Sequence, residues 1–133
     1  MEQKIIGNRY QIMESIGTGG MAEVYKAFDT FLNREVAVKI LRAQYTDDEG
    51  FVSRFRQEAQ SAARLIHPKN INVYDVGRDD DSYYIIMEYV KGRTLKELIS
   101  AEGALDPMTA VIIAHGIASA LKHAHSRGII HCD

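Results

Sequence analysis

Apolar and polar residues follow two different periods along the chain, and this difference predicts two regions. Strand-like alternation occurs in five short runs: 10–16, 23–29, 35–41, 71–77 and 82–89. Between the third and fourth runs, apolar residues recur every three or four positions over 51–66, which predicts a helix that ends before His67-Pro68. The order β-β-β-α-β-β predicts an antiparallel sheet that carries one helix.

After Gly92 the chain has the pattern of helices and loops. Thr94-Leu95-Lys96-Glu97 fits the Ser/Thr-x-x-Glu capping box, and Asp106-Pro107 is typical of a second helix start. The second helix extends to about Ser126 and is apolar nearly all round, as in helices buried inside a domain. Only seven residues follow it, so we expect that a covering part of the fold is missing. The uncovered helix 106–126 is then a candidate surface for self-association.

Composition excludes several classes of protein. With 46% hydrophobic and 26% charged residues, the chain is globular rather than disordered. A net charge of −2 gives no reason to expect nucleic acid or an anionic membrane as partner. One cysteine, Cys132, excludes an internal disulfide and indicates a reducing compartment. The N-terminus has no signal-peptide core and the apolar stretch 110–124 is too short to span a membrane, so we expect a cytoplasmic location.

A glycine-rich turn, Gly17-Thr18-Gly19-Gly20, separates the first two strands. Glycines let the backbone turn sharply and point its N–H groups at phosphate oxygens. The same turn is equally typical of a plain hairpin. A dinucleotide-binding fingerprint would require a helix after the glycines, whereas Glu23 begins a strand-like run, so that interpretation fails.

Lys39 is a cation in an otherwise apolar strand, on the face that alternation assigns to Ala37 and Leu41. A lysine that extends to solvent at a sheet edge is the ordinary explanation. The alternative is a lysine that binds α- and β-phosphates, held in place by Glu58 on the helix. For Glu58 the ordinary explanation is a solvated surface carboxylate.

Two further segments are candidate sites. Met87-Glu88-Tyr89-Val90 lies where strands give way to helices, and exposed backbone there could bind a planar heterocycle or simply be a linker. Histidines near His131-Cys132 raise the question of a metal ion. However, His123 and His125 are two positions apart and do not share a helix face, so we predict no metal site.

In this order, the features resemble the first half of a bacterial, eukaryotic-like serine/threonine protein kinase of the type that carries PASTA repeats. The resemblance depends on the glycine-rich loop, Val36-Ala37-Val38-Lys39, Glu58, the 87–90 segment and Gly128-Ile129-Ile130-His131-Cys132-Asp133. It extends from about residue 10 to residue 133. It implies an α+β fold: a kinase N-lobe with a five-stranded antiparallel sheet and one helix in 1–90, then the first helices of an incomplete C-lobe in 91–133.

The resemblance also implies a role for each matching residue. Ile16, Val24 and Ala37 would sandwich the adenine of ATP, Met87 would be the gatekeeper, and backbone groups of Glu88 and Val90 would bond the edge of the base. The loop that would cover the phosphates comprises Gly17, Thr18, Gly19, Gly20, Met21 and Ala22. Lys39 would hold the α- and β-phosphates and pair with Glu58, and Asp133 would accept the proton of the substrate hydroxyl.

The chain departs from the family pattern in several places. Ala22 replaces the third glycine of the loop, and Lys69-Asn70-Ile71 stands where Asn-Ile-Val is usual. Cys132 replaces an arginine that commonly receives the activation-loop phosphate; a thiol cannot make that bidentate contact, so we do not expect this form of control. The Mg²⁺ ligands of the family lie beyond Asp133, so we expect no phosphotransfer from this chain alone.

The sequence therefore predicts an ATP-binding kinase that transfers the γ-phosphate to serine and threonine hydroxyls of protein substrates. ATP is the expected ligand, with Mg²⁺ in a longer parent protein, which could itself be membrane-anchored. The alternative is a non-catalytic, degenerate kinase fragment that binds a nucleotide or a partner. A ligand-free α+β domain would require the ordered motifs to be a coincidence.

Overall fold

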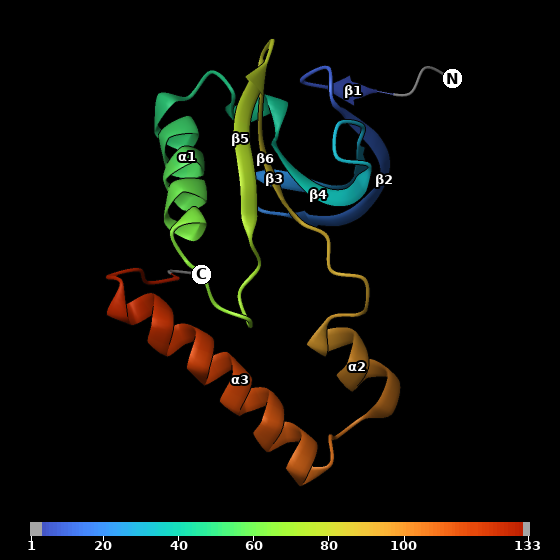
Figure 1. Ribbon diagram of the computed structural model, residues 1–133, viewed down its shortest axis with the longest axis vertical. Coiled ribbons are helices and arrows are strands. Elements are labelled where there is room, and N and C mark those ends of the chain that lie inside the picture. The colour runs from blue at the N-terminus through green and yellow to red at the C-terminus, as the bar shows by residue number, and fades with distance from the viewer. Residues whose placement is uncertain (1–3, 132–133) are drawn as a thin grey trace. The chain divides into compact units, whose positions relative to one another are not determined.

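The computed structural model describes residues 4–131, which divide into two compact units (Figure 1). The first unit comprises the residues up to Arg64 together with Ile71–Tyr89. The second comprises Leu65–Asn70 together with the residues from Val90 onward. Within residues 4–131, no helix is both long and apolar enough to cross a membrane.

The first unit is built on a six-stranded antiparallel sheet with the order β1-β2-β3-β4-β6-β5. Its strands are β1 (Ile5–Ile6), β2 (Tyr10–Gly19), β3 (Ala22–Asp29), β4 (Arg34–Leu41), β5 (Val73–Asp79) and β6 (Ser82–Glu88). Five of them confirm the predicted runs, with ends that differ by a few residues. β1 has no counterpart among the predicted strands, because two residues are too few to show an alternation.

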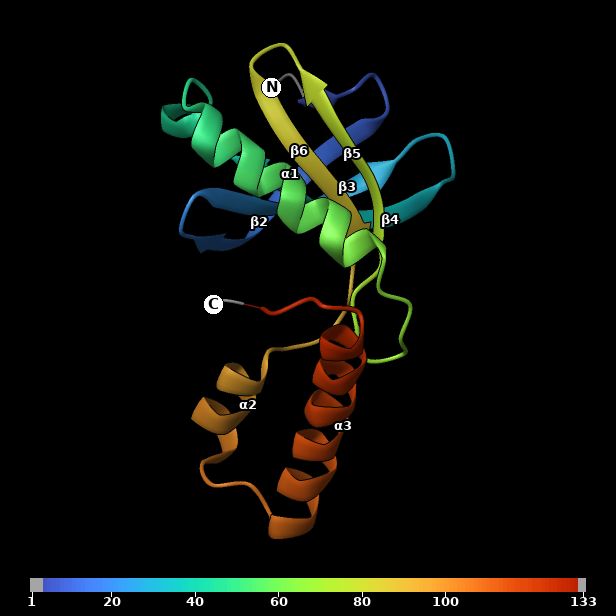
Figure 2. The same cartoon turned by 90° about the vertical axis from the view of Figure 1, so that its left-hand side faces the viewer.

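Helix α1 (Glu49–Ala63) lies across the sheet of the first unit (Figure 2). It begins two residues earlier than predicted, because the Asp48 carboxylate caps it by accepting from the N–H groups of Gly50 and Phe51, at 2.9 and 3.3 Å. It also ends three residues earlier than predicted, at Ala63, and the segment Leu65–Asn70 that follows belongs to the second unit. A short 3₁₀ helix, η1 (Ala43–Tyr45), precedes it.

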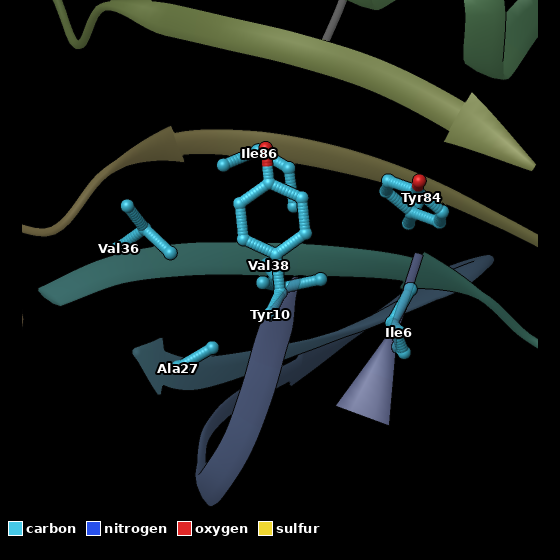
Figure 3. Packing of buried hydrophobic residues seen from close by; sticks show 7 residues of the cluster. All are labelled: Ile6, Tyr10, Ala27, Val36, Val38, Tyr84 and Ile86. Carbon is cyan, nitrogen blue, oxygen red and sulfur yellow. The ribbon is translucent and has the colours of Figure 1, made fainter. Parts of the chain in front are cut away.

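Alternation along the strands separates two buried clusters. The first contains no α1 residue and consists of Ile6, Tyr10, Ala27, Val36, Val38, Tyr84 and Ile86 (Figure 3). The second joins the sheet to α1 and consists of Ala22, Leu41, Phe55, Ala59 and Ile85. Burying each large side chain contributes about 1.5–3 kcal/mol, so these clusters are the main source of stability of the first unit.

Tyr84 packs against backbone that must be glycine. A Cβ added to Gly77 or to Gly7 would collide with the Tyr84 hydroxyl. Gly7 also takes φ +60°, a conformation that favours glycine. The Tyr84 ring in turn meets the Tyr10 ring edge-on at 6.2 Å between centroids.

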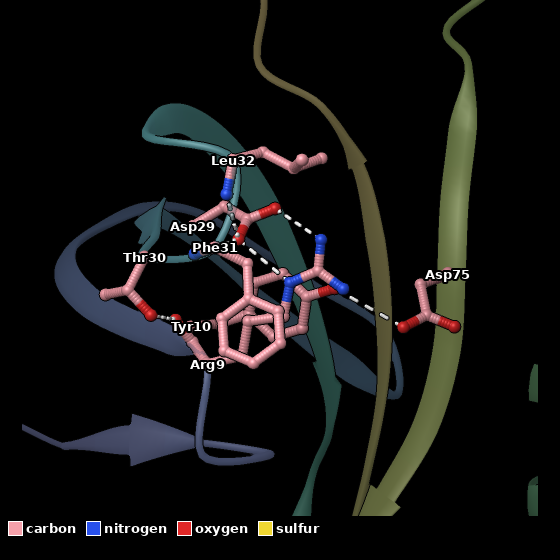
Figure 4. Close-up of polar contacts among 7 residues, drawn as sticks. All are labelled: Arg9, Tyr10, Asp29, Thr30, Phe31, Leu32 and Asp75. Carbon is pink, nitrogen blue, oxygen red and sulfur yellow. Dashed lines mark hydrogen bonds and ion pairs between the residues drawn. The ribbon is translucent and has the colours of Figure 1, made fainter.

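A buried carboxylate, Asp29, ties the end of β3 to the turn before β2 (Figure 4). Arg9 donates to it twice, from Nε at 2.8 Å and from Nη2 at 2.9 Å. The backbone N–H groups of Phe31 and Leu32 also donate, at 2.9 and 3.2 Å. The hydrogen bonds from Arg9 hold the pKa of Asp29 below its usual value, although burial acts in the opposite direction.

The second unit contains helices α2 (Leu95–Glu102) and α3 (Pro107–Ser126), which begin where their capping signals predict. Thr94 accepts from the N–H of Glu97 at 3.1 Å, and Asp106 accepts from the N–H of Thr109 at 3.3 Å. Together with the sheet and α1, these helices confirm the predicted α+β fold. Their large apolar side chains are mostly exposed: Leu95, Ile99, Met108, Val111, Ile112, Ile117 and Leu121. Self-association through 106–126 stays a prediction.

Segment 65–70 packs within the second unit against α3. His67 Nε2 lies 3.1 Å from the Ser119 hydroxyl, and the rings of His67 and His123 are 5.4 Å apart. The Nδ1 atom of His67 accepts from the N–H of Lys69 at 3.0 Å. Because Nδ1 is an acceptor, the Nε2 atom carries the proton and donates to Ser119.

Candidate functional site

Cross-strand register brings several predicted site residues onto one face of the sheet. Lys39 lies opposite Val24 on one side and Ile85 on the other. In the next row, Ala37 lies opposite Met87. These side chains share the face of the second cluster, which α1 covers in part. Positions from three separate strands therefore meet on the α1 face.

The glycine-rich turn joins β2 to β3, the strand that carries Val24. Gly17 lies opposite Val24, and Gly19 lies opposite Ala22, so the turn itself is Gly20-Met21. Gly20 takes φ +45°, which favours glycine. No heavy atom lies within 4 Å of a Cβ built on Gly19 or Gly20, so the space beside this backbone is open.

Ile16 reaches this face through an irregularity of β2. Ser15 lies opposite Tyr25, but Gly17 lies opposite Val24, the very next residue of β3. One extra residue, Ile16, is therefore inserted as a β-bulge. Alternation counted from Ser15 assigns Ile16 to the face of Val24, and its side chain is exposed there.

The charged centre of the face is an ion pair between Lys39 and Glu58. Lys39 Nζ lies 2.5 Å from Glu58 Oε1, with side-chain exposures of 26% for Lys39 and 54% for Glu58. The buried residues Phe55 and Ala59 flank Glu58 in α1, so packing of the helix sets the direction of the carboxylate. Exposed ion pairs contribute only about 0–1 kcal/mol, so this pair orients the ammonium more than it stabilises the fold.

Glu88 lies at the end of β6, and its backbone N–H group already has a hydrogen-bond acceptor within the protein. Its N–H donates to the Asn72 carbonyl at 2.8 Å, and its side-chain Oε1 accepts from the Asn72 N–H at 3.2 Å. A ligand at this position would therefore have to meet the Glu88 carbonyl. Val90 belongs to the second unit and its side chain is exposed.

A second charged cluster on this face has no counterpart among the predicted site residues. Lys26 lies opposite Ala37, in the row that also contains Met87. Its Nζ atom is 3.2 Å from Glu35 Oε1 and 5.2 Å from the centroid of the Tyr89 ring. The available signal was period-2 alternation, which places Lys26 on the face of Val24, but nothing in the sequence shows which partners it meets.

The predicted catalytic residue Asp133 lies outside the described residues, as does Cys132, the replacement of the family's arginine. Within 4–131, no group of three or more histidine, cysteine, aspartate or glutamate side chains is arranged to hold a metal ion. The described candidate site thus comprises the turn, the strand residues and the Lys39–Glu58 pair of the first unit.

A family model for the protein kinase domain matches residues 10–133. The chain therefore belongs to the protein kinase family. It is 55% identical over 130 residues to the serine/threonine-protein kinase PrkC of Bacillus subtilis (strain 168), covering 98% of this chain and 20% of that relative. It is 44% identical over 132 residues to the serine/threonine-protein kinase PknB of Mycobacterium tuberculosis (strain ATCC 25177 / H37Ra), covering 96% and 21%. The chain thus spans about a fifth of the length of these relatives.

Solved structures agree with this assignment. The M. tuberculosis PknI kinase domain superposes with a TM-score of 0.82 at 30% identity, covering 100% of this chain and 54% of that one. A structure of Rad53 1–466 in complex with AMP-PNP gives a TM-score of 0.80 at 32% identity, covering 94% and 32%. The predicted resemblance to bacterial serine/threonine kinases is confirmed, while the PASTA repeats stay a prediction.

Proposed function

We propose that the first unit binds ATP against the α1 face of its sheet, and that the protein transfers the γ-phosphate to serine and threonine hydroxyls of protein substrates. The observation that carries this proposal is the Lys39–Glu58 ion pair on the α1 face, where Lys39 lies opposite Val24 of the strand that the glycine-rich turn joins to β2. Members of the kinase family use ATP with Mg²⁺ in this reaction. Residues 1–90 are the proposed nucleotide-binding lobe and 91–133 the start of the second lobe.

The residues present fit a nucleotide. Ile16 and half-buried Val24 offer apolar surface for adenine, and the Glu88 carbonyl offers an acceptor for its amino group. Ala37, the third proposed contact of the base, is buried on β4, between the neighbouring strands β3 and β6. Open backbone at Gly19 and Gly20 allows the proposed loop, Gly17 to Ala22, to approach phosphate oxygens closely.

Each residue has a defined part in the proposed chemistry. Phosphoryl transfer depends mainly on positioning and charge stabilisation. The Lys39 ammonium supplies a positive charge to the α- and β-phosphates, and Glu58 fixes its direction. Met87 limits the depth of the base site, and backbone of Val90 bonds the second edge of the base. Asp133 is the proposed acceptor of the substrate hydroxyl proton.

The described residues do not fit Mg²⁺ by themselves, since no suitable group of carboxylates lies within 4–131. When bound, Mg²⁺ neutralises charge on the β- and γ-phosphates. The ligands expected for it lie beyond Asp133 in the family. A cytoplasmic location is part of the same proposal, because ATP is the proposed ligand.

Calorimetric titration of the purified chain with ATP and Mg²⁺ tests the binding step. We expect saturable binding that Lys39→Met weakens by about tenfold or more, because a charge-assisted contact to phosphate contributes about 1.5–3 kcal/mol. Lys96→Met, at an exposed lysine of α2, is the matched control and should leave the affinity unchanged. An unaffected Lys39→Met variant, or equal losses in both variants, would contradict the proposed site.

Phosphotransfer needs its own assay on the full-length protein, with labelled ATP, a protein substrate and phosphoamino-acid analysis. The product should be phosphoserine or phosphothreonine, and Asp133→Asn should abolish transfer while ATP affinity is retained. ATP binding without any transfer in the full-length protein would instead favour the non-catalytic nucleotide-binding module.

A further inference from the structure

Lys26 links β3 and β4 to Tyr89, the residue that follows β6 beside the proposed base site. It projects from β3 on the face of Ala37, and its side chain is only 18% exposed. Glu35 of β4 accepts at 3.2 Å, and the Tyr89 ring lies 5.2 Å from the ammonium. An ammonium above an aromatic face is attracted by the negative face of the ring, and more strongly when water is partly excluded.

The ammonium is held in its charged form. The hydrogen bond to Glu35 raises the pKa of Lys26, with smaller contributions from the charges of Glu35, Tyr89 and Glu14, while burial acts in the opposite direction. Glu14 faces Lys26 directly from β2. The ammonium that lies near the Tyr89 ring is therefore charged throughout the physiological pH range.

Tyr89 shares a peptide unit with the proposed contact to the base. The Glu88 carbonyl belongs to the planar peptide bond between Glu88 and Tyr89, so a rotation at Tyr89 changes the direction of that carbonyl. The N–H group of Glu88, on the other side of its Cα atom, is held by a hydrogen bond to the Asn72 carbonyl. Beyond Glu88, which lies opposite Val36 of β4, the Tyr89 side chain is a further point at which this peptide unit is held, through its contact with Lys26.

We propose that Lys26 is a positioning residue for nucleotide recognition: with its ammonium held by Glu35, it clamps the Tyr89 ring and so directs the Glu88 carbonyl at the amino group of the base. The inference rests on the proposed function, because it assumes a nucleotide on this face. Lys26 acts on the base through Tyr89 and makes no contact of its own with the ligand. Its loss should weaken recognition of the base and leave recognition of the phosphates intact.

Two probes separate these contributions: ATP, and inorganic tripolyphosphate, which has the phosphates but no base. Lys26→Met should weaken ATP binding about threefold to tenfold, the range that a partly buried cation–π contact supports. The affinity for tripolyphosphate, measured by competition with a fluorescent ATP analogue, should stay within twofold. Lys39→Met should weaken both ligands.

Conservative variants distinguish positioning from a general effect on folding. Tyr89→Phe keeps the ring and Lys26→Arg keeps the cation, so both should bind ATP within about twofold of wild type. Tyr89→Leu should match Lys26→Met, and the double variant should lose no more than either single variant, because both remove one contact. Thermal unfolding checks that each variant is folded. If Lys26→Met does not fold, Tyr89→Leu tests the clamp in its place.

The outcomes separate the inference from the proposed function. If wild type binds ATP and Lys39→Met does not, but Lys26→Met and Tyr89→Leu bind ATP normally, the clamp is wrong and the nucleotide site stands. Parallel losses for ATP and tripolyphosphate in Lys26→Met would likewise overturn the clamp, because they indicate a general loss of positive charge. No binding of either probe by wild type would overturn the proposed function itself.

Discussion

The two units hide their apolar side chains to very different degrees. In the first, residues from the sheet and α1 close two buried clusters, with Phe55, Ile85 and Ile86 almost inaccessible. In the second, Ala124 is the one buried hydrophobic residue among those described, although α3 is rich in isoleucine, valine and alanine. Apolar composition alone therefore does not produce a core.

The two units also differ in how far apart in sequence the residues are that determine their structure. α2 and α3 begin at Thr94 and Asp106, whose caps involve residues three positions away. The sheet depends on pairs far apart in sequence, such as Lys39 with Ile85. Local signals define where the helices of the second unit begin, whereas the first unit is also specified by long-range packing.

The largest expected effect comes from truncating the same residue type in each unit. Ile86→Ala leaves a cavity in the first cluster and should lower the free energy of unfolding by about 2–5 kcal/mol. Ile112 is 64% exposed, so Ile112→Ala should change the free energy of unfolding by no more than about 0.5 kcal/mol. Urea denaturation followed by circular dichroism measures both. Similar losses would show that Ile112 is packed in solution and would remove the contrast between the units.

The second effect compares two ion pairs. Arg9→Ala leaves the buried Asp29 without its charged donor and should cost about 2–3 kcal/mol, moderated by the backbone donors of Phe31 and Leu32. Arg93 and Glu102 of the second unit are 3.1 Å apart but exposed, so Arg93→Ala should cost less than about 1 kcal/mol. The same denaturation experiment ranks them, and an Arg93→Ala effect as large as that of Arg9→Ala would contradict the burial argument.

A smaller loss of stability is expected when the pH is lowered, because Asp29 becomes protonated. The pKa of Asp29 is lowered from its ordinary value of 3.8, chiefly by Arg9, so its charged form stabilises the fold above that pH. This contribution is lost as the pH falls below about 4 and through the lowered pKa of the folded state. Unfolding of wild type and Asp29→Asn, measured from pH 7 to pH 3, should differ most near neutrality and converge in acid. A gap that is constant with pH would exclude this linkage.

The smallest expected loss of stability comes from removing a helix cap, and it should be about equal in the two units. Asp48→Ala and Asp106→Ala each remove a helix cap, at the starts of α1 and α3, and each should cost about 1 kcal/mol. Asparagine caps nearly as well as aspartate, so Asp48→Asn and Asp106→Asn are the controls. Amide hydrogen exchange in the first turn of each helix reports the loss locally. Faster exchange in α1 alone would mean that the Asp106 cap does not form.

Much of the fold could be predicted because its signals are local. Period-2 alternation located five strands, and Thr94 and Asp106 marked two helix starts. The end of α1 was wrong because Ile66 continues the apolar spacing although the chain has already left the helix. Its start was wrong because the apolar stripe begins at Phe51, while the Asp48 cap determines where the helix begins.

Less of the candidate site than of the fold could be predicted from the sequence. Residue types and spacing offered Glu58 as a partner for Lys39 but also left both residues with ordinary surface explanations, and the family resemblance favoured the pair. The bulge at Ile16 and the contact of Lys26 with Tyr89 depend on the register of neighbouring strands, which one sequence does not display.

The packing of Tyr84 against Gly7 and Gly77 limits how this sequence can vary. In a saturation library selected only for soluble expression, Gly77 should tolerate no replacement, since even a methyl group would displace the phenol ring. Intolerance there would arise from shape and carry no information about catalysis. A pair of compensating changes, with a smaller residue at position 84, is the route by which the glycine could be lost.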